Sequence, residues 1–168
     1  MMRSLVILLL LVQSIFIDIA ADNLVQKISL SSDSGYLAPN QKSTISLFYE
    51  SDNGLPATGI GIRIYFDSSA IQLNSFSNVL PNSNVGIQTL KDDENYDGNT
   101  KTDKYIVGAW ANVNGGWPNV PLQPVKLFDL QVVTSHSFEG TQMNAVVTSS
   151  DVNFKGVGSS ISILGSDR

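Results

Sequence analysis

The fold class is decided by the stretch Gly59-Ile60-Gly61-Ile62-Arg63-Ile64-Tyr65-Phe66. Its isoleucines and its phenylalanine occupy every second position, and Arg63 and Tyr65 fall between them. Because successive side chains of a β-strand point to opposite faces, a period of two over this length predicts a half-buried strand.

The same alternation recurs along the chain in runs rich in β-branched and aromatic residues: 24–30, 45–49, 105–113, 128–132, 143–148, 152–154 and 160–164. Turns rich in Gly, Asn and Ser separate these runs. No segment after residue 21 shows the spacing of an amphipathic helix. The sequence therefore predicts an all-β fold, an antiparallel β-sandwich of about eight or nine strands.

The chain begins with the pattern of a secretory signal peptide. A positive start at residues 1–3 is followed by the apolar run Leu5–Ile17, then Asp18 and the small residues Ala20 and Ala21. The alternative is a membrane anchor, but a span needs about 20 apolar residues. We predict a signal peptide over 1–21, a single domain over 22–168, a secreted or cell-surface location and no membrane span after cleavage.

Composition narrows the function. The chain carries a formal net charge of −5, contains no cysteine and has one histidine. Clustered basic residues are missing, which argues against nucleic-acid binding, and the lack of thiols removes disulfides and cysteine chemistry. His136 lies in a polar turn, and the spacing of the glutamates (Glu50, Glu94, Glu139) does not pair two carboxyl groups as glycoside hydrolysis requires. We predict a protein that is not an enzyme, with a hydrolase as the least favoured alternative.

An acidic loop at 92–103 contains a possible metal site. From Asp93 onward, oxygen-bearing side chains alternate and are followed by Gly98, as in the first half of a calcium loop. Calcium takes six to eight oxygen ligands at about 2.3–2.6 Å, and alternate positions of a tightly wound loop point inward. The predicted ligands are Asp93, Asn95, Asp97, Asn99 and Asp103.

The alternative for this loop is a solvated turn, because Asp, Asn and Gly are also common in exposed turns. Lys104 stands where an EF-hand carries its bidentate glutamate, so the loop is not an EF-hand. The carboxylates would repel one another unless a cation neutralised them, and this favours calcium as a cofactor.

Three aromatic residues are weaker candidates for ligand binding. Trp110 and Trp117 flank a Gly-Gly turn, and exposed tryptophans can stack on sugar rings. Tyr65 lies on the face opposite Ile64 and could contact a partner. The alternative is that the tryptophans pack inside the fold.

The stretch 58–73 resembles a cohesin segment in which an alternating strand ends in Phe66-Asp67 and a second apolar strand follows a short turn. The stretch 125–132, leading to Gly140-Thr141, is similar to a later strand of that family, and the order of the pieces matches over most of 24–164. Carbohydrate-binding modules and other adhesin sandwiches share this layout.

The resemblance implies a jelly-roll sandwich that binds a dockerin-like protein through one sheet face, with a glycan as the other partner class. A second hypothesis is a self-assembling filament or matrix subunit, in which the segment 23–32 adds to the sheet edge of a neighbouring copy.

Overall fold

A computed structural model describes residues 24–80 and 88–166. Within them lie eleven strands and one short 3-10 helix, η1: β1 (Leu24–Ser32), β2 (Tyr36–Leu37), β3 (Lys42–Ser51), η1 (Asp52–Gly54), β4 (Gly59–Phe66), β5 (Ile71–Ser77), β6 (Gln88–Lys91), β7 (Lys104–Ala111), β8 (Val125–Thr134), β9 (Gly140–Ser150), β10 (Phe154–Val157) and β11 (Ser159–Gly165). The predicted signal peptide lies outside the described residues. No helix of the described part is long and apolar enough to cross a membrane.

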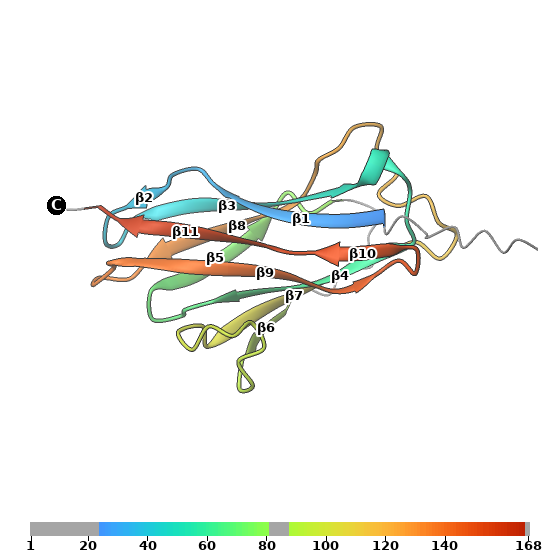
Figure 1. Ribbon diagram of the computed structural model, residues 1–168. Coiled ribbons are helices and arrows are strands. Elements are labelled where there is room, and N and C mark those ends of the chain that lie inside the picture. Colours follow the sequence, from blue (N-terminus) through green and yellow to red (C-terminus); the bar gives the residue numbers. More distant parts are fainter. Residues whose placement is uncertain (1–23, 81–87, 167–168) are drawn as a thin grey trace, which may run out of the picture.

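The strands form two sheets that pack face to face (Figure 1). A five-stranded sheet has the order β10-β1-β3-β8-β5, and a six-stranded sheet has the order β2-β11-β9-β4-β7-β6. The predicted all-β sandwich is confirmed. The sheets are mixed, however, because β1 pairs with β10 and β2 pairs with β11 in parallel. These pairs join the first strands to the last, and the short strands β2 and β6 account for the larger number of strands.

The predicted alternation in β4 is confirmed, and it builds the core between the sheets. Ile62 and Ile64 are fully buried, and burying an aliphatic side chain of this size contributes about 1.5–3 kcal/mol. Facing strands supply the rest of the core in the same alternating way, including Ile45, Leu47, Tyr49, Ile106, Phe128, Leu130 and Met143.

The two flanks of the sandwich differ. On one flank the chain passes from β10 in the five-stranded sheet directly to β11 in the six-stranded sheet, with Gly158 between them. On the other flank β5 and β6 are the last strands of their sheets in the described part of the chain. The sandwich therefore has one flank with the short β10–β11 connection and the end strands β10 and β2, and a second flank with the end strands β5 and β6.

Candidate binding face

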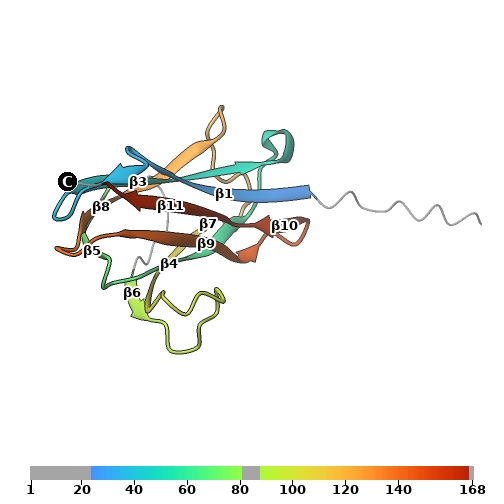
Figure 2. The ribbon, with the colours of Figure 1, turned by 60° about the vertical axis from the view of Figure 1, so that its left-hand side comes forward.

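The acidic loop connects β6 to β7 and projects beyond the sheet next to β6 (Figure 2). Asp97 anchors it to the six-stranded sheet. The Asp97 carboxylate accepts hydrogen bonds from Asn144 Nδ2 on β9 at 2.7 Å and from Thr102 Oγ1 at 2.9 and 3.0 Å. The backbone N–H of Asn99 donates to the same carboxylate at 3.1 Å. These bonds attach the loop to β9 and hold its Asp97–Thr102 turn together.

Two other predicted ligands, Asp103 and Asp93, are bonded to protein groups. Asp103 accepts from the backbone N–H and the hydroxyl of Ser68 at 2.7 and 2.6 Å. Burial raises the pKa of Asp103, but these bonds and the nearby Lys104 outweigh it, and the net pKa is lowered. Exposed Asp93 pairs with Lys91 at 2.5 Å.

The structure does not gather the predicted calcium ligands. In residues 24–80 and 88–166, no three acidic or histidine side chains stand close enough to hold a metal ion. Asp92 differs from the predicted ligands, because both of its carboxylate oxygens are buried without a hydrogen-bond partner. Sequence reasoning did not select Asp92, and calcium binding stays a prediction.

An arginine–tyrosine cluster occupies the outer face of the six-stranded sheet. The Arg63 guanidinium lies 4.8 Å from the ring centroid of Tyr105 on β7 and 5.0 Å from that of Tyr96 in the acidic loop. Its Nη1 donates to the Tyr65 hydroxyl at 3.4 Å. Stacking on two rings holds a cation in place, with a contribution of about 0.5–1 kcal/mol per exposed contact. Sequence reasoning missed Arg63 and Tyr105, although the outward position of Arg63 in the alternation was visible.

Exposed apolar and amide side chains extend this outer face. Leu90 and Val146 are exposed there, on β6 and β9 respectively. Beside the acidic loop, a groove of 450 Å³ runs along β9 and β11 and is lined in part by Asn99, Gln142 and Asn144. The face therefore combines a fixed cation, aromatic rings, apolar side chains and amide groups.

Three predicted contact residues are buried. Tyr65 is 1% exposed and lies beneath the arginine–tyrosine cluster. Trp110 is 1% exposed and stacks on Phe128, with ring centroids 5.8 Å apart. Trp117 is 4% exposed and meets Tyr49 edge to face at 4.3 Å. The predicted tryptophan platform is corrected, because both rings fill the interior and offer no open face to a sugar.

The outer face of the five-stranded sheet has a different character. On β8, Asp129 accepts from Ser46 Oγ at 2.5 Å and Asn78 Nδ2 at 2.6 Å and pairs with Lys126 at 2.9 Å. Burial raises the pKa of Asp129, but these partners outweigh it, and the net pKa is lowered. The polar groups around Asp129 are thus bonded to one another.

No protein-family model and no curated protein matches the sequence. Solved structures do match it over most of its length. A cohesin module from a Clostridium perfringens family 33 glycoside hydrolase aligns with a TM-score of 0.57 and 10% identity, over 87% of this chain and 100% of that one. The chain has a cohesin-like fold. The predicted resemblance is thus confirmed at the level of the fold.

Two further cohesin structures agree with this result. The solution structure of a Clostridium acetobutylicum cohesin aligns with a TM-score of 0.55 and 15% identity, over 86% of this chain and 92% of that one. A cohesin from a type I cohesin–dockerin complex of Clostridium thermocellum aligns with a TM-score of 0.53 and 13% identity, over 84% of this chain and 95% of that one.

Proposed function

We propose that this cohesin-like chain is a non-catalytic module that binds an extracellular protein of dockerin kind through the outer face of its six-stranded sheet. The observation that carries the proposal is the cluster of Arg63, Tyr96 and Tyr105. Arginine and tyrosine dominate the energetic centres of protein interfaces, especially where they are held rigidly before binding. Tyr96 remains 60% exposed and available to a partner.

Three comparisons within the molecule support this assignment. The five-stranded face binds its own polar groups internally, around Asp129. The burial of Trp110 and Trp117 removes the basis for sugar stacking. Every described carboxyl group with a shifted pKa (Asp103, Asp129, Asp151) is shifted down, whereas a general acid needs a raised pKa.

The solved cohesin from Clostridium thermocellum was crystallised with a dockerin, which supports a partner of that kind. The signal-peptide pattern of residues 1–21 supports placement outside the cell or on its surface. Self-assembly by donation of β1 is disfavoured, because β1 already pairs with β10 on one edge and β3 on the other.

Replacing Arg63 with glutamate is expected to weaken partner binding about a hundredfold, because it removes the cation from between two tyrosines and places a like charge beside the acidic loop. Isothermal titration against a panel of dockerin modules measures the effect. The control is Lys42→Glu, which makes the same charge change at an exposed residue on β3 of the other sheet. Failure of every dockerin to bind contradicts the dockerin assignment. Equal weakening by both variants contradicts the choice of face.

We also propose that the acidic loop binds a calcium ion with Asp92 as a ligand. The spacing of the acidic residues and the two unpartnered oxygens of Asp92 support this proposal. Millimolar calcium is expected to raise the melting temperature by a few degrees, roughly what occupancy at several times Kd contributes. Asp92→Asn should abolish the rise, whereas Asp52→Asn, remote in η1, should leave it intact. A melting temperature that is the same in calcium and in chelator rejects the metal.

A further inference from the structure

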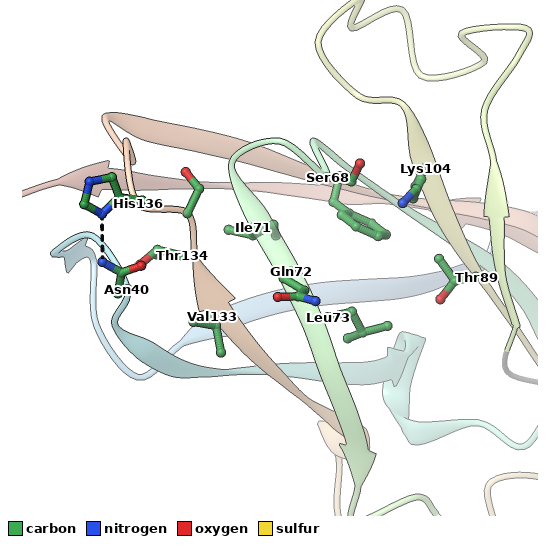
Figure 3. A pocket seen from close by; sticks show the side chains of 12 residues that line it. Asn40, Ser68, Ile71, Gln72, Leu73, Thr89, Lys104, Val133, Thr134 and His136 are labelled. Carbon is green, nitrogen blue, oxygen red and sulfur yellow. Dashed lines mark hydrogen bonds between the residues drawn. The ribbon is translucent and has the colours of Figure 1, made fainter.

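A groove of 570 Å³ opens on the flank where the edges of β5 and β6 lie (Figure 3). We name it the flank groove. On the side that faces β6 and β7 it is lined by Phe66, Ser68, Ile71, Leu73, Thr89 and Lys104. It contains none of the residues of the arginine–tyrosine cluster, and it borders the acidic loop where Ser68 donates to Asp103.

Among residues 24–80 and 88–166, no strand pairs with the outer edge of β5, and this edge offers backbone hydrogen-bonding groups to the groove. The N–H of Ser135, at the end of β8, donates to the Ala70 carbonyl at 2.8 Å, which sets the phase of the β5–β8 ladder. In an antiparallel ladder, hydrogen-bonded pairs alternate with pairs that are not hydrogen-bonded. The backbone N–H and C=O of Gln72 therefore point toward β8, whereas those of Leu73 point away from β8. The N–H and C=O of Leu73 therefore point toward the open edge.

The walls of the groove suit an extended polypeptide. Phe66 and Ile71 belong to the core and are already covered, and Leu73 beside them is the partly buried apolar side chain of the groove. An added strand would place an apolar side chain over Leu73 while its main chain pairs with the edge. The hydroxyls of Ser68 and Thr89 flank the same space.

The charge of the lining residues favours a segment with an acidic side chain. The lining residues of the flank groove include Lys104 and His136 but no aspartate or glutamate, in a chain with a net charge of −5. Figure 3 places Lys104 on the β7 side of β5, and His136 on the opposite side, where Asn40 contacts it at 3.3 Å. Lys104 takes part in none of the ion pairs found in the described residues. Its nearby carboxylate, Asp103, is already hydrogen-bonded to Ser68, so Lys104 can pair with a carboxylate from outside.

We propose that the flank groove binds an extended segment of a partner protein that carries an acidic side chain. The segment adds to the edge of β5 next to Leu73, its apolar side chain covers Leu73, and its carboxylate pairs with Lys104. This second interaction surface uses other side chains than the proposed dockerin face.

The test uses a fluorescein-labelled eight-residue peptide of alternating valine and threonine with one central aspartate. Its binding to the full-length protein is measured by fluorescence anisotropy. The matched peptides carry asparagine in place of aspartate, or N-methyl groups on alternate amides. We expect the aspartate peptide to bind, the asparagine peptide to bind about tenfold more weakly, and the methylated peptide not to bind.

Two protein variants separate the local charge from the overall charge. Lys104→Glu should weaken binding of the aspartate peptide about tenfold. Lys155→Glu changes an exposed lysine on β10 of the other flank and should leave the binding unchanged. Amide chemical shifts of Leu73 and Thr89 should move on binding. Equal affinity for the aspartate and asparagine peptides, binding of the methylated peptide, or no binding at all overturns the proposal. Concentration-dependent shifts at these amides without peptide would overturn it in favour of a contact between two copies.

Discussion

Replacing Gly158 with alanine is expected to lower the free energy of unfolding by about 3 kcal/mol or more, among the larger effects of a single substitution. A Cβ atom at this position would lie 2.1 Å from the Ala145 carbonyl oxygen and 3.2 Å from the Cα of Val146. Both obstacles are backbone atoms of the central strand β9, so no side chain can rotate away to make room.

The position matters because the chain changes sheets there. β10 pairs with β1 in one sheet, and β11 pairs with β9 in the other, starting with Ser159 opposite Ala145. Relief of the clash must move the start of β11 away from β9 or detach β10 from β1. Either movement opens the flank where the chain joins the two sheets.

Urea denaturation of the variant measures this effect. Gly35→Ala is the control, because a Cβ there meets nothing within 4 Å, and it should change the stability by less than about 0.5 kcal/mol. If Gly158→Ala and wild type unfold at the same urea concentration, the close approach between β9 and Gly158 is wrong.

Replacing Asp151 with alanine is expected to cost about 3 kcal/mol, because it leaves buried donors without their acceptor. Asp151 is 8% exposed and accepts from the backbone N–H of Thr58 at 2.9 Å, from its hydroxyl at 2.8 Å and from the backbone N–H of Asn153 at 3.0 Å. Its own N–H donates to the buried Gln26 side chain, which also reaches the Tyr49 hydroxyl. The carboxylate thus joins the loops that hold Thr58 and Asn153, and the backbone N–H connects them through Gln26 to β1 and β3.

The same site predicts a pH dependence. Hydrogen bonds from the backbone of Asn153 and from Thr58 hold the pKa of Asp151 below its ordinary value of 3.8. A depressed folded-state pKa contributes stability above the unfolded value and loses it as the pH falls through the folded value. The stability difference between wild type and Asp151→Asn should therefore be full near neutral pH and shrink below about pH 4.

Thermal unfolding of wild type and Asp151→Asn at a series of pH values from neutral to acidic measures this stability difference. Exposed Asp93, paired with Lys91 at the surface, provides the control, and Asp93→Asn should cost less than about 1 kcal/mol at any of these pH values. A difference for Asp151→Asn that grows toward acid would contradict the depressed pKa.

The alternation in Gly59–Phe66 was enough to predict a strand, and recurrence of the pattern was enough to predict a sandwich. The short strands β2 and β6 were not predicted, since two and four residues carry too little periodicity to be distinguished from a loop. The parallel pairs were missed for another reason. Which strands become neighbours depends on the packing of segments from opposite ends of the chain.

The candidate site shows the same division. The acidic loop was found from its composition, but the spacing predicted ligands pointing at one centre, whereas Asp97 bonds to Asn144, a residue far along the chain. Tyr65 is buried next to Arg63 and Tyr105, neighbours that the alternation alone did not reveal. Trp110 and Trp117 had an interior position as an open alternative, and the structure decided for it.

What the sequence by itself determined is the class of fold, because a period of two in side-chain direction is a local property of the strand that Gly59–Phe66 forms. The tertiary structure alone decided which outward face of that strand stays open, which aromatic rings are covered and where Arg63 finds its tyrosines. The physical reason is that alternation assigns each residue to one of two faces, while the use of a face depends on what the rest of the chain lays against it.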